Sequence, residues 1–130
     1  MAIAGYGRLA EMLNKPEEAK KFTEMAKRMA IEWERRADDG DHYRLAFDMP
    51  GTWSQKYNFV WDKVLGLNIL PDRIMKKEVT FYLKTQNKYG LPLDNRFTWG
   101  KTDDTVWSAT MADSEGDFQE LIRPIWKYVN

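Results

Sequence analysis

Two polar segments of the chain, residues 38–58 and 89–104, contain most of the side chains that could carry out chemistry. Both combine carboxylates, amides, basic groups and tryptophan with glycine and proline, and this mixture suits a small polar ligand. Two carboxylates from separate loops can divide the proton transfers of a hydrolysis, as in glycoside hydrolysis. We therefore take Asp41 and Asp94 as the candidate catalytic acid and base. The side chains expected to hold the substrate are Trp53, Gln55, Lys56, Asn58 and Arg96.

Several of these residues also have simpler explanations. Asp41 and its neighbouring aspartates can cap helices or complete turns, and Arg96 can pair with Asp94 only to fix its loop. His42 is better explained as a hydrogen-bonded loop residue than as a catalyst, and Trp53 can pack its loop onto the core. These alternatives stay open at the level of the sequence.

Ser54 and Lys56 offer a further alternative, nucleophilic catalysis by a serine hydroxyl with a lysine as its activating neighbour. A spacing of two residues does not by itself place the amine on the hydroxyl. The carboxylate pair therefore remains the main prediction.

Composition excludes several other classes of chemistry. The chain has no cysteine, which removes disulfides, thiolate metal sites and cysteine nucleophiles. Its single histidine, His42, argues against a Ser-His-Asp relay or a histidine-rich zinc site, so no metal and no cofactor is expected. The 20 basic and 20 acidic residues balance, which argues against nucleic acid as a partner. No apolar run approaches the roughly 18 residues of a membrane span.

The elements that must position the loops are helices. Apolar residues recur at three- and four-residue spacing, charged residues fill the other positions, and no stretch alternates with period two. Proline and serine mark helix starts at Pro16, Pro71 and Ser114, and Gly66 marks an end. We predict an all-α fold with helices over residues 3–13, 16–37, 57–65, 71–83, 103–111 and 114–126.

These helices form three antiparallel hairpins. The turns inside each hairpin are short, whereas residues 39–54 and 87–102 form long connections between hairpins, and loops of that length are usually functional. Alternating directions place both long loops on one face, where we expect the site. Trp33, Trp61, Trp107 and Trp126 lie on apolar stripes and are expected in the core, whereas Trp53 and Trp99 lie on the rim.

The loops resemble those of the fungal and bacterial glutaminase A family. The resemblance is carried by DDGDHYRLAF at 38–47, GTWSQKYNFVWDKVLGL at 51–67 and NKYGLPLDNR at 87–96, with WSAT at 107–110. It covers essentially all 130 residues and matches the C-terminal portion of the family's six-helical-hairpin domain, including that of Bacteroides-like bacterial members. That domain is an (α/α)6 toroid of the six-hairpin glycosidase type, and in the family it follows a β-rich domain.

The resemblance implies that residues 1–130 are a single partial domain, about three hairpins of a toroid, in a larger protein. The parent would hydrolyse the side-chain amide of L-glutamine to glutamate and ammonia, and would be secreted or periplasmic, although this chain carries no signal. Without the remainder of the parent chain, the isolated fragment is expected to be inactive or to form a homodimer that covers its open helix faces.

Two other functions compete with glutamine hydrolysis. A glycoside hydrolase or carbohydrate-binding toroid needs aromatic platforms and two carboxylates at a defined separation. A non-catalytic helical interaction module needs equivalent repeats, and the three hairpins do not repeat one another in sequence. The expected ligand is a small polar molecule, glutamine or a sugar.

Overall fold

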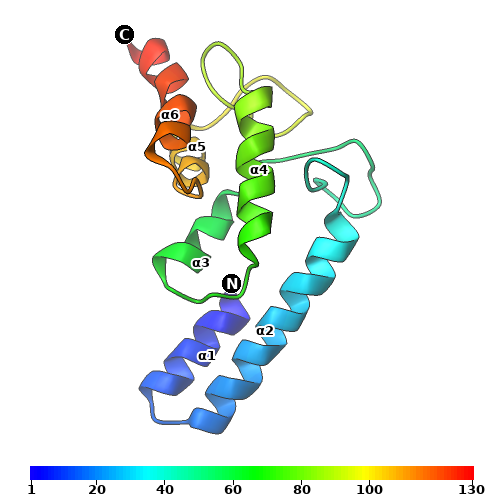
Figure 1. Ribbon diagram of the computed structural model, residues 1–130, viewed down its shortest axis with the longest axis vertical. Helices are drawn as coiled ribbons and strands as arrows, with labels where there is room; N and C mark the ends of the chain where they lie inside the picture. The colour runs from blue at the N-terminus through cyan, green and yellow to red at the C-terminus, as the bar shows by residue number, and fades with distance from the viewer.

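The computed structural model describes all 130 residues, and the protein is entirely helical with no extended strand (Figure 1). This confirms the predicted all-α class. The helices are α1 (Ala2–Met12), α2 (Pro16–Ala37), α3 (Val60–Val64), α4 (Asp72–Thr85), α5 (Thr102–Ala109) and α6 (Glu115–Val129). A 3-10 turn, η1 (Tyr57–Phe59), leads into α3. No helix is both long enough and apolar enough to cross a lipid bilayer.

The helix ends follow local sequence signals. Pro16 is the first residue of α2, where its missing N–H costs nothing. Ser114 caps α6, since its Oγ accepts a hydrogen bond of 3.1 Å from the Asp117 N–H. Gly66 ends α3 with φ of 60°, a conformation that glycine adopts without a steric penalty. The predicted third helix begins as a 3-10 turn, because the Phe59 N–H donates to the Lys56 carbonyl three residues earlier.

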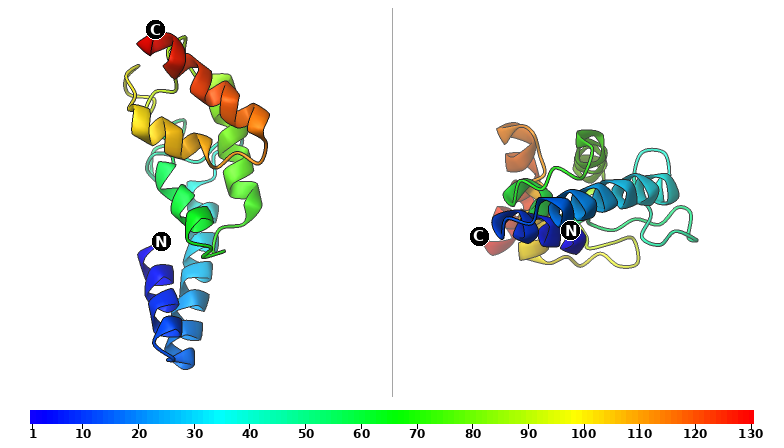
Figure 2. Two further views of the ribbon diagram at one scale, coloured as in Figure 1. Left: turned by 90° about the vertical axis from the view of Figure 1, so that its left-hand side faces the viewer. Right: turned by 90° about the horizontal axis from the view of Figure 1, so that it is seen from below.

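Helices α1 and α2 form an antiparallel hairpin that extends away from the rest of the molecule (Figures 1 and 2). Small residues, including Ala4 and Ala26, are buried in it. A Cβ atom on Gly7 would lie 2.8 Å from the Thr23 Oγ1 atom, so close packing of the two helices requires glycine there. The main core lies elsewhere, between α4, α5 and α6. It contains Val79, Tyr82, Leu91, Ala109, Met111 and Leu121.

The two long loops lie together at one end of the molecule, as the hairpin pattern predicts. They follow the upper ends of α2 and α4 in Figure 1. The Gln55 N–H donates to the Leu93 carbonyl at 2.8 Å, and the Asn95 N–H donates to the Trp53 carbonyl at 3.2 Å. The loops are therefore joined through their backbones, and side chains predicted from separate parts of the sequence share one surface.

The molecule is open rather than compact. Its accessible surface is 8154 Å², whereas a compact monomer of 15.4 kDa has roughly 7200 Å². The exposed apolar side chains include Leu9, Met12, Leu13, Met29, Ile31, Val64, Leu65 and Val129.

The prediction that Trp126 packs in the core is wrong. Its side chain is 66% exposed, and Trp61 lies at the surface as well, while Trp33 and Trp107 are half-buried. The C-terminal turns of α6 extend beyond α5 (Figure 2), so no helix covers Trp126. An apolar stripe on a helix thus identifies a face that can be buried, but not whether a neighbour covers it.

Candidate functional site

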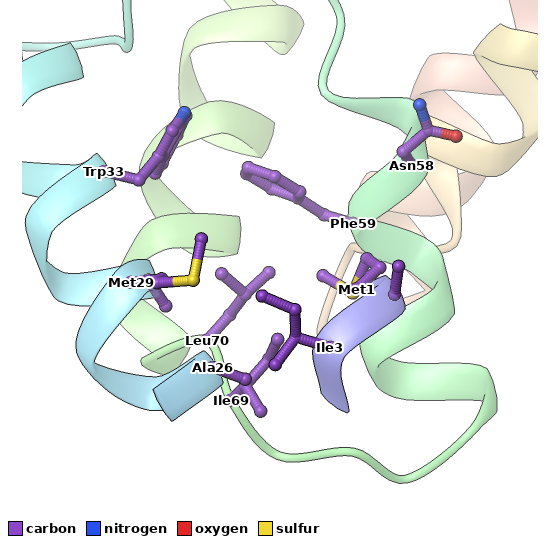
Figure 3. A pocket seen from close by; sticks show the side chains of 11 residues that line it. Met1, Ile3, Ala26, Met29, Trp33, Asn58, Phe59, Ile69 and Leu70 are labelled. Atoms are coloured by element: carbon purple, nitrogen blue, oxygen red, sulfur yellow. The ribbon is translucent and has the colours of Figure 1, made fainter. Parts of the chain in front are cut away.

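Two of the depressions in the structure contrast in the chemistry of their lining. One is an apolar groove of about 380 Å³ between α1, α2 and the segments that flank α3 (Figure 3). Its lining residues include Ile3, Met29, Trp33 and Phe59, and Asn58 is the one polar residue among them. With a single amide and no ionisable side chain, this groove lacks the polar side chains that acid–base or nucleophilic chemistry requires.

The other depression, which we call the loop cleft, is a polar cavity of about 310 Å³ where the two long loops meet. Five of the seven predicted site residues line it: Gln55, Lys56, Asn58, Asp94 and Arg96. Ser54 lines it too. The remaining lining residues are Leu45, Tyr57, Phe59 and Leu93. We take the loop cleft as the candidate functional site.

Asp94 and Arg96 form a bidentate ion pair at the mouth of the cleft. Arg96 donates from Nε to Oδ1 at 3.0 Å and from its terminal nitrogen to Oδ2 at 2.6 Å, and the Arg96 backbone N–H also donates to Oδ1. The guanidinium holds the pKa of Asp94 below its usual value, although burial opposes that shift. Asp94 itself is buried, whereas the outer edge of Arg96 is exposed. The carboxylate thus fixes the guanidinium, which remains able to bind a ligand.

The side-chain nitrogen and oxygen of Gln55 are both hydrogen-bonded to other residues of the protein. Its Nε2 donates to the carbonyl oxygens of Leu91 and Pro92, both at 3.1 Å, and lies 3.3 Å from the Thr105 hydroxyl. Its Oε1 accepts from the Ser108 hydroxyl at 3.0 Å. These contacts give Gln55 a positioning role between the second loop and α5, and the substrate contact predicted for it stays a prediction.

The Lys56 amine is held by three oxygen atoms. Its Nζ lies 3.0 Å from the Tyr43 carbonyl oxygen, 2.9 Å from the Ser54 carbonyl oxygen and 3.1 Å from the Ser54 hydroxyl. Burial lowers the pKa of Lys56, and the nearby Glu78 carboxylate partly opposes that shift. The structure therefore places the amine on the hydroxyl, which the two-residue spacing alone could not establish.

A buried carboxyl group beneath Lys56 was missed in the sequence. Glu78 on α4 is fully buried and accepts from the Tyr43 backbone N–H at 2.8 Å and from the Tyr82 hydroxyl. The Tyr82 hydroxyl in turn accepts from the Lys56 N–H at 2.7 Å. Ile74, Glu78 and Tyr82 recur at four-residue spacing, so Glu78 lies on the buried face of α4. A lone acidic residue on an apolar stripe is the signal that could have found it.

Asp41 and Trp53, the other two predicted residues, do not line the loop cleft. The Asp41 side chain is 68% exposed and contacts His42 at 2.8 Å, which lowers the pKa of Asp41. Trp53 packs against the main core and against Phe81, with 5.4 Å between ring centroids. The structure thus separates Asp41 from the surface that holds Asp94.

The pKa directions bear on the predicted acid and base. A general acid at neutral pH needs a raised pKa, but the pKa values of Asp41 and Asp94 are both lowered by their basic partners. Burial raises the pKa of Glu78 and of Asp104, and neither of these two lines the cleft. The catalytic roles of Asp41 and Asp94 stay predictions, and the observed environments favour the ionised form of both.

Comparison with known proteins agrees with this arrangement of helical pairs and long loops. Residues 1–130 match the glutaminase A six helical-hairpin domain from end to end. The chain belongs to this family. It is 32% identical over 101 residues to glutaminase A of Aspergillus oryzae, an alignment that covers 75% of the chain and 15% of that protein. It is 25% identical to a probable glutaminase of Arthroderma benhamiae, over 98% of the chain and 18% of that protein.

The chain therefore spans less than a fifth of the length of these two relatives of the glutaminase A hairpin family. No solved structure matches it significantly. The family resemblance of the loop motifs is confirmed. The comparisons assign no role to any residue of the loop cleft.

Proposed function

We propose that this chain is part of a longer glutaminase, which hydrolyses the side-chain amide of L-glutamine to glutamate and ammonia, and that the loop cleft contributes to its active site. Support comes from membership of the glutaminase A hairpin family and from two relatives named as glutaminases. We also propose that this chain forms about half of a ring of helical hairpins. The remaining hairpins of the longer protein would then pack against the apolar faces that are exposed here.

The observation that carries the proposal is the chemistry of the loop cleft. Arg96 presents a fixed, exposed guanidinium, which suits bidentate binding of the α-carboxylate of an amino acid. Asn58 lines the same cleft and offers an amide donor and acceptor. Ser54 and Lys56 line the same cleft. The side-chain amide of a glutamine bound by Arg96 and Asn58 would therefore lie near these two residues.

The test is a substrate panel on the full-length protein that contains this chain. Ammonia release would be measured with L-glutamine, D-glutamine and L-asparagine, and sugar release with a panel of glycosides. We expect turnover of L-glutamine well above that of the other compounds. Turnover of a glycoside without ammonia release from glutamine would overturn the proposal.

A glycoside hydrolase is the second candidate, because one observation favours it. Phe97 and Trp99 form an exposed stacked pair on the second loop, with ring centroids 5.9 Å apart and planes inclined by 19°. Such a platform can pack against the apolar face of a sugar. However, Asp94 is the one carboxylate that lines the loop cleft, and it is paired with Arg96, whereas glycosidases of this kind need two carboxyl groups.

A further inference from the structure

Ser54 and Lys56 are held together on one wall of the loop cleft. Ser54 forms a backbone bridge with Asp94 of the second loop, and the next residue, Gln55, is anchored through both its backbone and its side chain. The Lys56 backbone N–H donates to the buried Tyr82 hydroxyl at 2.7 Å. These bonds fix the backbone of residues 54–56, and in this arrangement the Lys56 Nζ lies 3.1 Å from the Ser54 Oγ.

The surroundings of the Lys56 amine fit two protonation states. As an ammonium group, it can donate one hydrogen bond to each of three oxygens: the Tyr43 carbonyl, the Ser54 carbonyl and the Ser54 hydroxyl. As a neutral amine, it keeps two donors for the two carbonyls, and its lone pair can accept the hydroxyl proton. Burial lowers the Lys56 pKa, a shift in the direction of the neutral amine. A group that is satisfied in both states can pass a proton back and forth.

We propose that Ser54 is the nucleophile of the hydrolysis and that Lys56 is its general base. This rests on the proposed function. The Ser54 oxygen attacks the side-chain amide carbon while its proton passes to the Lys56 amine. The carbon–nitrogen bond then breaks, the leaving nitrogen takes the proton from Lys56, and ammonia departs. In the second half, water gives a proton to Lys56 and attacks the ester, and the Ser54 oxygen leaves and recovers that proton.

This assignment agrees better with the structure than a carboxylate base does. Asp94 is engaged by three hydrogen bonds from Arg96, and Asp41 does not line the cleft. Serine activated by lysine is an established variant of nucleophilic hydrolysis. Glu78 and Tyr82 act as positioning residues, since they contact Tyr43 and Lys56 rather than the cleft.

The experiment compares Ser54→Ala, Lys56→Arg and the control Ser114→Ala in the full-length protein. We expect the first two to lower kcat for ammonia release on the order of a thousandfold or more, while Ser114→Ala stays within about twofold. Lys56→Arg keeps a cationic donor for the two carbonyl oxygens but cannot accept a proton, so its thermal unfolding reports whether the fold is retained. Acid quench and peptide mass spectrometry should detect a glutamyl ester on Ser54 of the wild type.

The outcomes separate this proposal from the proposed function. If the wild type releases ammonia and Ser54→Ala retains its turnover, the Ser54–Lys56 pair is overturned and the proposed function stands. If the wild type does not act on glutamine, the proposed function fails, and the pair is tested with p-nitrophenyl acetate. If Ser54 is acetylated faster than Ser114 and Lys56→Arg abolishes this difference, the pair is supported. Equal acetylation of Ser54 and Ser114 overturns the pair.

Discussion

Glu78 is the residue on which the interior of the site depends. Its carboxyl group has no contact with solvent and joins α4 to both ends of the first loop, through the Tyr43 N–H and through Tyr82 to Lys56. Burial raises the Glu78 pKa, and the charge of Lys56 partly opposes this. A buried acid and a buried amine that compensate each other are costly to separate.

Replacement of Glu78 should therefore destabilise the fold in a graded way. Glu78→Ala removes the acceptor of two buried donors, the Tyr43 N–H and the Tyr82 hydroxyl, and the carboxyl group near the Lys56 amine, and we expect a loss of about 3–5 kcal/mol in the free energy of unfolding. Glu78→Gln keeps the shape and one acceptor oxygen for the Tyr43 N–H, but presents an amide N–H instead of a second acceptor to the Tyr82 hydroxyl, and should cost less. Urea denaturation measures the free energy of unfolding of both variants, and Glu24→Gln, at an exposed position, serves as the control. Equal losses for Ala and Gln would contradict a stabilising role for the shape and hydrogen bonds of this side chain.

Asp94 makes a pH-dependent contribution to the stability of the fold. Its ion pair with Arg96 determines whether that contribution grows or falls with pH. Arg96 lowers the folded pKa of Asp94 below the ordinary value of 3.8, so the stabilisation is present above pH 3.8 and is lost as pH falls through the folded pKa. We expect Asp94→Asn to lower Tm by about 2–5 °C at pH 7. The difference from wild type should shrink progressively as the pH falls below 3.8. A difference independent of pH would contradict the ion pair as its cause.

At the scale of elements, Asp39 organises the first loop. Its carboxylate accepts from the Gly51 N–H at 2.6 Å and from Arg44 Nε at 3.0 Å, and Gly51 adopts φ of 75°. These contacts hold Arg44 and Gly51 against Asp39 at the start of the loop. Residues 53–56, which follow, pair with the second loop. Asp39 thus acts on the site through the course of the backbone.

Loss of the Asp39 carboxylate should loosen this loop without unfolding the helices. For Asp39→Asn we expect amide hydrogen exchange to rise by about tenfold or more across residues 44–53, while α4 keeps its protection, because local opening does not require global unfolding. Asp48→Asn, on the same loop, removes an exposed carboxylate and should change nothing. Uniformly faster exchange throughout the chain would instead indicate that Asp39 supports the whole fold.

The helices and their order could be predicted from the sequence, since apolar periodicity and signals such as Pro16 and Ser114 are local. The junction of the two loops could also be predicted, because alternating helices bring their connections together. The inner hydrogen-bond network could not. Glu78 lies 22 residues from Lys56 in the sequence, and the Lys56 amine reaches the Ser54 hydroxyl only because α4 and the first loop pack together. Local spacing carries no information about such contacts.

At the scale of the whole molecule, apolar side chains of several helices are exposed. Met29 and Ile31 on α2, Val64 and Leu65 at the end of α3, and Trp126 on α6 are all exposed. These faces lie on several helices, as expected for hairpins that continue around a ring.

The isolated 130-residue chain should therefore be inactive on L-glutamine and should self-associate. We expect its apparent mass in sedimentation to rise with concentration above 15.4 kDa, because burial of apolar surface drives association. The full-length protein, studied in parallel, should be active. A monomeric isolated chain that releases ammonia as fast as the full-length protein would contradict the half-ring interpretation.

The central claim, that the loop cleft is the glutamine site, is tested most directly at Arg96. Arg123 has the same exposed side-chain fraction, 59%, and is also paired with a carboxylate, so it serves as the matched control. The measurement is kcat/KM for ammonia release from L-glutamine by the full-length protein. We predict that Arg96→Ala lowers it by about 10- to 100-fold, mainly through KM, while Arg123→Ala leaves it unchanged. Equal values for the wild type and Arg96→Ala would contradict the account.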